Sequence, residues 1–142
     1  MILRMNQPID PAVLAEVLVK RLNDVLPASV RLGTSGSTVT ASTRGTLWAY
    51  FEIAAPGSRL DSSPAILADI VDGILSSVQD FAAEGTGEPW PAIQTPSRQG
   101  SADPLPRANA LPLEEEIRLW FGESDNPTLE LPPIKLAELH SA

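Results

Sequence analysis

Apolar residues recur every three or four positions from Val13 to Leu26, which predicts a helix with one buried stripe. Asp10 and Pro11 come just before this run. They form a strong helix start, because an aspartate side chain can accept from a free N–H of the first turn and proline fits the first helical position. Pro27 cannot continue a helix, so we expect the helix to end before it.

The apolar period changes to alternation between residues 29 and 54. Glycine-bearing turns at 33–36 and 44–45 divide this segment into three short strands, which predicts an antiparallel meander. The residues expected on the core face are Val30, Leu32, Val39, Ala41, Leu47, Ala49, Phe51 and Ile53. Those expected on the opposite face are Arg31, Thr38, Thr40, Ser42, Trp48, Tyr50 and Glu52.

A second helix start, Asp61-Ser62-Ser63-Pro64, precedes a helical pattern that runs to about Glu84 and ends at Gly85-Thr86-Gly87. Its expected buried stripe comprises Ile66, Leu67, Ile70, Val71, Ile74, Leu75, Val78, Phe81 and Ala82. On the other face, the spacing of Asp69 and Asp72 suits Mg²⁺ binding or acid–base chemistry. Because no other ligand motif converges on the pair, we interpret these carboxylates as a solvated helix face.

The segment 85–112 holds six of the fourteen prolines and shows no apolar period. We interpret it as a proline-rich strap or linker, either mobile or held down by anchors such as Trp90 and Ile93. The remainder, 113–142, is expected to form a C-terminal β-hairpin and tail.

The start of this C-terminal part has helical propensity, but its apolar residues alternate with others over 117–121, which favours a strand over a helix. Residues 122–127 then form the hairpin loop and 128–131 a returning strand. Pro132 and Pro133 must end that strand or place it at a sheet edge.

Together these patterns predict one α+β domain over residues 1–142. We expect an antiparallel sheet of about five strands in the order α-β-β-β-α-β-β, with both helices packed on one face and Leu18, Phe51 and Ile70 in the core. This order of elements is similar to that of small dimeric secretion chaperones, which bind an unfolded segment of a client protein. The likeness involves element order and no motif, and it implies a protein-binding role.

Composition narrows the classes of function. The absence of cysteine excludes disulfides, thiolate metal sites and a cysteine nucleophile. The net charge is −8: residues 1–62 carry six Lys/Arg against five Asp/Glu, and residues 63–142 carry four against thirteen. No clustered positive surface is expected, so nucleic acid and anionic membranes are disfavoured as partners. No apolar run approaches the roughly 18 residues of a membrane span, and the N-terminus lacks a signal-peptide pattern, so we expect a cytoplasmic protein.

Catalytic motifs are missing as well. The only histidine, His140, lies three residues from the end, and no G-x-S-x-G motif accompanies the serines. The segment 33–36 lacks the lysine and the following helix of a phosphate loop, which favours a hairpin turn. We therefore expect no enzyme activity, cofactor or metal.

The most informative residues are aromatic. Trp48, Tyr50 and Trp120 are all out of phase with the core residues of their strands, so we expect one aromatic cluster on the open face of the sheet, with Arg31 or Arg118 as polar neighbours. Such an apolar patch is seldom left to solvent. The alternatives for its cover are the strap with Trp90, a second subunit, or a bound peptide or ligand.

These residues predict a non-catalytic protein-interaction module, chaperone-like or self-associating, that binds a protein partner or a second copy through its aromatic sheet face. The alternative is a small-molecule-binding or catalytic domain. Its pocket would lie between the sheet and the strap, lined by the three rings and by carboxylates of the second helix.

Overall fold

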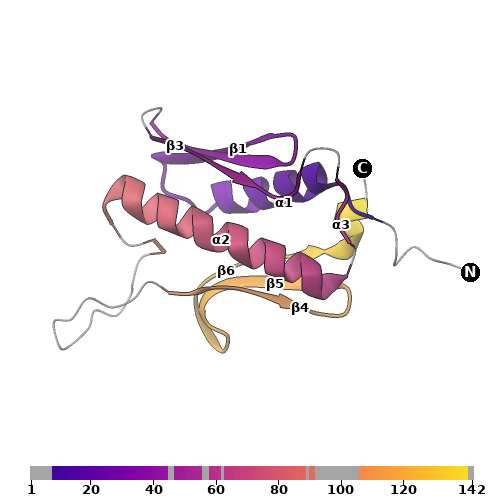
Figure 1. Ribbon diagram of the computed structural model, residues 1–142. Coiled ribbons are helices and arrows are strands. Elements are labelled where there is room, and N and C mark those ends of the chain that lie inside the picture. The colour runs from indigo at the N-terminus through magenta and orange to yellow at the C-terminus, as the bar shows by residue number, and fades with distance from the viewer. Residues whose placement is uncertain are drawn as a thin grey trace, which may run out of the picture.

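The structure, a computed structural model, contains two antiparallel sheets with helices between them. The structure describes residues 8–44, 47–55, 58–61, 63–88, 90–91 and 106–140. Its elements are α1 (Pro11–Asn23), β1 (Val30–Ser35), β2 (Thr38–Thr43), β3 (Leu47–Glu52), α2 (Pro64–Thr86), β4 (Ala108–Pro112), β5 (Glu116–Glu123), β6 (Asn126–Lys135) and α3 (Leu136–His140). The sheets have the strand orders β1-β2-β3 and β4-β5-β6. Helices α1 and α2 lie in the layer between the sheets (Figure 1).

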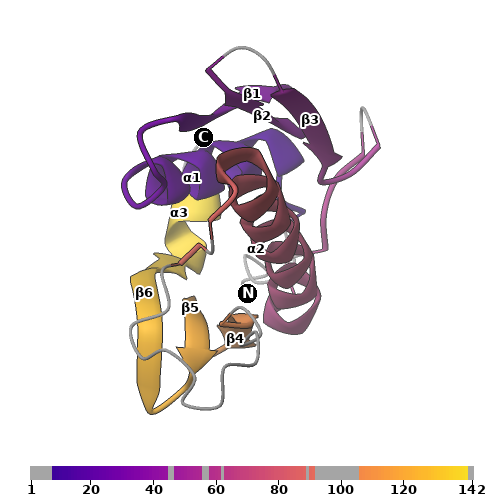
Figure 2. The same cartoon turned by 90° about the vertical axis from the view of Figure 1, so that its left-hand side faces the viewer.

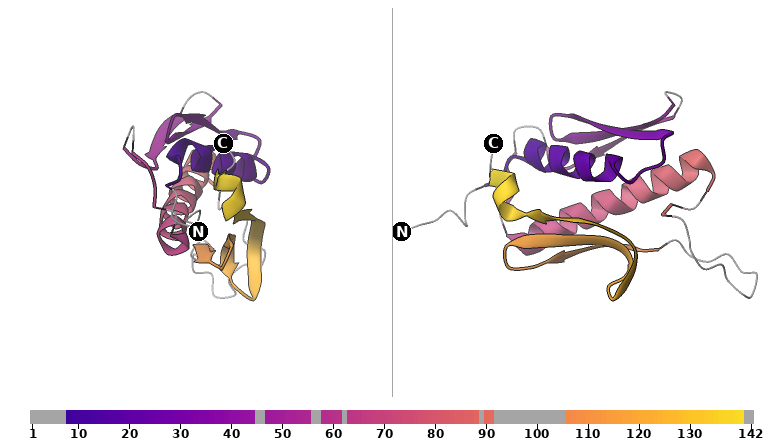
Figure 3. Two further views of the ribbon diagram at one scale, coloured as in Figure 1. Left: turned by 90° about the vertical axis from the view of Figure 1, so that its right-hand side faces the viewer. Right: turned by 180° about the vertical axis from the view of Figure 1, so that it is seen from behind.

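The α+β class is confirmed, but the prediction of one sheet of about five strands covered by two helices is wrong. Each of the two long helices contacts strands of both sheets. The buried residues of α2 include Ala68 and Gln79, which lie outside the predicted stripe and widen it toward β4. A stripe of that width needs cover from two sides, and the second sheet supplies it, as two further views show (Figure 3).

Both predicted helix starts are confirmed. Asp10 caps α1, where its Oδ1 accepts from the Ala12 N–H at 2.9 Å and Pro11 holds the first position. Ser63 and Pro64 occupy the same two positions in α2. Thr86 is the last residue of α2, and Gly87 follows it in the left-handed conformation with φ 75°, which a glycine adopts without a steric penalty.

The predicted faces of the first sheet are confirmed at the described positions. Val30, Leu32, Val39, Ala41 and Ile53 are buried against the helices, and the side chain of Leu47 lies outside the described residues.

The three predicted core residues differ in how deeply they are buried. Leu18 is fully buried, as expected, whereas Phe51 and Ile70 are only partly buried. Phe51 lies on the edge strand β3, where its ring meets Phe81 edge-on at 6.4 Å and no further strand covers its other side. Ile70 lies at the margin of the buried stripe of α2, beside the exposed Ile66.

The second sheet contains a strand that the sequence patterns did not predict. β4 lies inside the segment interpreted as a strap, and it pairs with β5 from Ala108 opposite Phe121 to Pro112 opposite Ile117. The strap is therefore shorter than predicted, and residues 92–105, with the predicted anchor Ile93, lie outside the described residues. The strand predicted over 117–121 is confirmed as part of β5, while the short helix α3 was not predicted.

The last strand, β6, continues through Pro132 and Pro133 at the edge of its sheet, which is the second of the two predicted outcomes. The hairpin between β5 and β6 depends on Gly122, whose φ is 102°. A Cβ atom at this position would lie 2.8 Å from the backbone nitrogen of Thr128, closer than real contacts allow. Only glycine fits here without a shift of the backbone.

The anchor predicted at Trp90 is confirmed. Its side chain is buried, its ring meets the ring of Phe121 edge-on at 5.1 Å, and its Nε1 donates to the carbonyl oxygen of Val25 at 3.3 Å. Trp90 therefore connects the end of α1 to the second sheet. In Figure 2 the chain after α2 passes down toward that sheet.

Candidate interaction surface

The five residues predicted to share one interaction face lie on two different sheets. Arg31, Trp48 and Tyr50 belong to β1 and β3, whereas Arg118 and Trp120 belong to β5. The prediction of a single aromatic cluster is therefore wrong. β5 pairs with β4 and β6, and the layer of α1 and α2 separates it from the first sheet (Figure 1).

Trp120 is covered by residues of its own sheet. Its exposed fraction is 6%, the guanidinium carbon of Arg118 lies 4.3 Å from the ring centroid, and the ring Nε1 donates to the carbonyl oxygen of Gly122 at 3.0 Å. Arg118 is fixed in turn by Glu130, whose Oε2 accepts from its Nε at 2.8 Å, and by the carbonyl oxygen of Ser124. Because Arg118 covers its ring and its N–H is already hydrogen-bonded, Trp120 has little surface left for contact with a partner.

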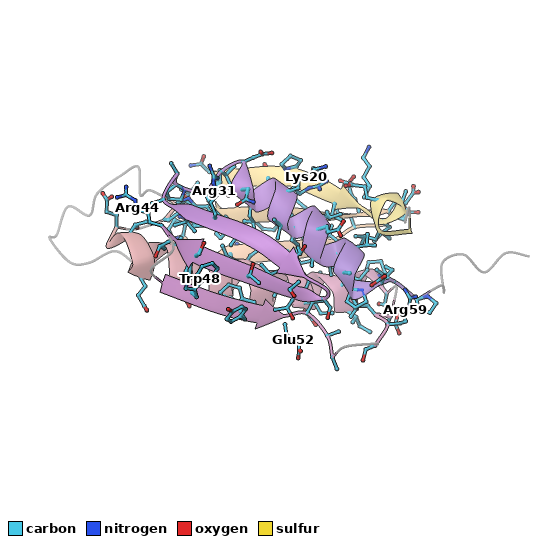
Figure 4. The ribbon with its side chains drawn as sticks, turned by 90° about the horizontal axis from the view of Figure 1, so that it is seen from above. Lys20, Arg31, Arg44, Trp48, Glu52 and Arg59 are labelled. Carbon is cyan, nitrogen blue, oxygen red and sulfur yellow. The ribbon has the colours of Figure 1, made fainter. Side chains whose placement is uncertain are left out.

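Trp48 and Tyr50 have the opposite environment. Their side chains are 57% and 67% exposed. Figure 4 shows Trp48 on the outer face of β3, away from the helices, and Tyr50, two residues along the same strand, lies on the same face. Trp90, which was one of the alternatives for their cover, packs instead against Phe121 in the core. Nothing in the core requires a large ring at either position, since both side chains point outward.

The strand register shows what surrounds these rings. Three cross-strand rows form the outer face of the first sheet: Arg31, Ser42 and Trp48; Gly33, Thr40 and Tyr50; Ser35, Thr38 and Glu52. The residues beside the rings on β2 are small, and Gly33 leaves the middle row without a side chain on β1. The two rings therefore form a ridge along β3 beside a low, polar surface.

The end of this face near Trp48 is basic. Arg31 and Arg44 are exposed, and within the described part of the chain neither forms an ion pair. Figure 4 shows both side chains at the same end of the sheet as Trp48, with Glu52 toward the other end. We call Arg31, Thr40, Ser42, Arg44, Trp48 and Tyr50 the aromatic face.

Alternation along the strands predicts most of this surface, but Arg44, Thr40 and Ser42 were not among the predicted site residues. The signal that identifies the last two is the turn between β1 and β2, in which Gly36 and Ser37 separate the paired residues Ser35 and Thr38. A two-residue turn fixes the register of a hairpin, and that register sets which residues lie beside each ring. Arg44 follows β2 with a φ of 50°, in the left-handed region.

The pocket proposed between sheet and strap is not formed by the predicted residues, since its rings lie on separate sheets. Among the described residues, a hollow of about 380 Å³ lies instead at the start of α1. Its lining includes Asp10 and Arg59, which approach each other at 3.7 Å and are both largely exposed. Such an exposed pair is weakly held, and it defines no reacting group.

Acidic residues of the second half do not form a metal cluster among the described residues. Asp69 and Asp80 are exposed on α2 and Asp72 is partly buried, while the side chain of His140 lies outside the described residues. Over the same described ranges, no helix is long and apolar enough to cross a membrane.

Comparisons with known proteins give no family. No protein-family model matches the chain, and neither a curated protein nor a solved structure matches it. The surface chemistry described above therefore carries the functional proposal.

Proposed function

We propose that this chain is a non-catalytic protein-interaction module whose aromatic face binds another polypeptide. The observation that carries the proposal is the exposure of Trp48 and Tyr50, in adjacent cross-strand rows, on a sheet whose core-facing side is already buried. Tryptophan, tyrosine and arginine are the residue types that most often dominate the binding energy of protein interfaces. Here all three types occur on one face.

The energetics support a polypeptide partner. An aromatic side chain buries about 150–250 Å² when fully covered, and apolar burial contributes roughly 25 cal/mol per Å². Two adjacent rings therefore supply a substantial driving force, and the small residues Thr40 and Ser42 leave space beside them for a partner's side chains. A small molecule has less to gain, because the face is open and has no enclosing walls.

Self-association through the same face is the second form of this proposal. A charge of −8 opposes the approach of two copies, but the basic end with Arg31 and Arg44 reduces that repulsion locally. The two forms are distinguished by the mass of the complex.

The test is photo-crosslinking of the full chain in the cell of origin, with benzoylphenylalanine placed at position 48. A matched control carries the same probe at Leu111, which is exposed on the other sheet. We expect discrete adducts from position 48 that are absent from position 111 and that weaken when Tyr50→Ala is added. An adduct of twice the chain's mass would identify a second copy as the partner. Equal adducts from both positions, or none from position 48, would refute the proposed function.

A further inference from the structure

The outer edges of the two sheets differ in whether another strand can pair with them. In an antiparallel ladder, alternate residues direct their N–H and C=O groups toward the neighbouring strand, and the residues between them direct these groups away. On an edge strand the second set faces solvent and can receive a further strand. The two sheets have four such edges, formed by β1, β3, β4 and β6.

The middle of the β1 edge, at Leu32, is closed by a side chain of α1. The bond from the N–H of Arg44 to the carbonyl oxygen of Ser29 fixes the alternation, so that Leu32 faces the edge. The amide side chain of Asn23 accepts from the N–H of Leu32 and donates to its carbonyl oxygen, both at 3.0 Å. An added strand would have to displace this paired amide.

The C-terminal half of the β6 edge, from Pro132 to Lys135, is closed by prolines and an arginine. Pro132 and Pro133 have no N–H, and their carbonyl oxygens accept from Arg21 at 2.8 Å. Farther along, the N–H of Lys135 donates to Glu138, which also pairs with Arg21 at 2.9 Å. Proline on an edge strand is a known way to prevent unwanted pairing.

The edge of β4 offers little. The bonds from Gly122 to Arg107 and from Leu113 to Glu116 fix the alternation, so that Ala108, Ala110 and Pro112 face outward. Pro112 has no N–H, and Ala108 is buried. A strand added here would find one accessible donor.

The edge of β3 differs from the other three edges. The bond from the N–H of Ile53 to the carbonyl oxygen of Ser37, at 3.0 Å, fixes the alternation, so that the backbone groups of Tyr50 and Glu52 face the open edge. Within the described residues, no side chain bonds to these groups and no proline lies in the strand. Figure 4 shows β3 along the margin of its sheet. The same strand carries the two exposed rings.

We propose that β3 receives an extended segment of a partner polypeptide as a fourth strand of the first sheet, and that this segment is acidic. The inference rests on the proposed function and names its binding mode. The backbone of the segment pairs with Tyr50 and Glu52, and its apolar side chains on the outer face lie beside the rings. Arg44, which follows β2 and has no ion-pair partner among the described residues, selects carboxylates at the Trp48 end.

The probe is a random twelve-residue peptide library displayed on phage and selected on the immobilised full chain. We expect enriched sequences that alternate apolar and polar residues and contain Asp or Glu. The best of them, made synthetically, is then titrated against the wild type and two proline variants. Glu52→Pro removes an edge N–H of β3, and the matched control Thr34→Pro removes an edge N–H of β1.

Glu52→Pro should weaken binding about tenfold or more, because the lost N–H and the proline ring both oppose strand addition. The charge change alone would strengthen binding of an acidic peptide, so it cannot explain a loss. Thr34→Pro should leave affinity within about twofold. In the wild type, hydrogen exchange of the Tyr50 and Glu52 amides should slow when the peptide binds, a readout that stands even where Glu52→Pro fails to fold.

The outcomes separate this inference from the proposed function. A peptide whose binding depends on Trp48 but neither responds to Glu52→Pro nor protects the Tyr50 and Glu52 amides would overturn strand addition and leave the interaction face intact. Enrichment of no peptide, or of basic peptides, would also overturn it. A dimer of the free chain in sedimentation that Glu52→Pro dissociates would show that a second copy occupies the edge instead.

Discussion

The two sheets bury their inner faces in the same way but present different outer faces. Trp48 and Trp120 both point away from the helices on strands of comparable length, yet one is mostly exposed and the other is buried. The difference comes from their neighbours. Trp120 has Arg118 stacked on its ring and Glu130 opposite it, whereas Trp48 has Ser42 opposite it.

The comparison shows that alternation determines which face a side chain occupies and that its neighbours determine whether it is accessible. The second sheet is closed on its outer face by Arg118 and along its last strand by Arg21. The first sheet is closed along β1 by Asn23 and open along β3. The first sheet is therefore the one that we propose binds a partner.

The largest effect is expected in the core of the second sheet. Phe121→Ala should lower the free energy of unfolding by about 3–5 kcal/mol, because the ring is fully buried and packs on Trp90. Phe51→Ala should cost less, about 1–3 kcal/mol, because its ring is only partly buried. Urea denaturation of both variants measures the difference. A larger loss of unfolding free energy for Phe51→Ala than for Phe121→Ala would mean that the first sheet, not the second, contributes the more deeply buried ring.

The two outward tryptophans give the most direct contrast. Trp120→Ala should cost about 2–4 kcal/mol, since it removes a buried ring and leaves Arg118 without its stacking partner. Trp48→Ala should change stability by less than about 0.5 kcal/mol, as expected for an exposed site. Equal costs in thermal or urea unfolding would mean that Trp48 is covered in solution.

Local chemistry explains why much of this fold could be predicted from the sequence. The helix start at Asp10 depends on a side-chain cap, both long helices begin with a proline in the first turn, and the faces of β1 to β3 depend on simple alternation. The partition into two sheets could not be predicted, because it depends on which strands pair across long sequence separations. β4 was hidden in addition by the prolines around it.

The candidate site was also predicted only in part. Trp48, Tyr50 and Arg31 were placed on the correct face because alternation within each strand sets the face of its side chains. Trp120 and Arg118 were assigned to the same face because they too are out of phase with the core residues of their strand. No local pattern distinguishes a strand that extends the first sheet from one that begins another sheet.

Two arginine substitutions, one in each sheet's surroundings, should show a smaller difference in stability. Arg21→Ala should lower the free energy of unfolding by about 1.5–3 kcal/mol, because a mostly buried guanidinium then no longer holds the carbonyl oxygens of β6 and the carboxylate of Glu138. Arg31→Ala, on the open face, should stay within about 0.5 kcal/mol. Urea denaturation provides both values, and similar losses would contradict the distinction between a closed and an available surface.

A smaller loss of stability than for Arg21→Ala is expected at the closed edge of the first sheet, and it tests why β1 and β3 differ. Asn23→Ala removes both bonds to Leu32 and should cost about 1–2 kcal/mol, since water can replace part of what is lost at an edge. Asn23→Asp should do no better, because a carboxylate accepts from the Leu32 N–H but meets the Leu32 carbonyl oxygen without a proton to donate. Hydrogen exchange of the Leu32 amide should accelerate in Asn23→Ala, while Asp24→Ala, at the exposed neighbouring position, should leave it unchanged. An unchanged exchange rate in Asn23→Ala would mean that the amide does not close this edge, and β3 would lose its distinction from β1.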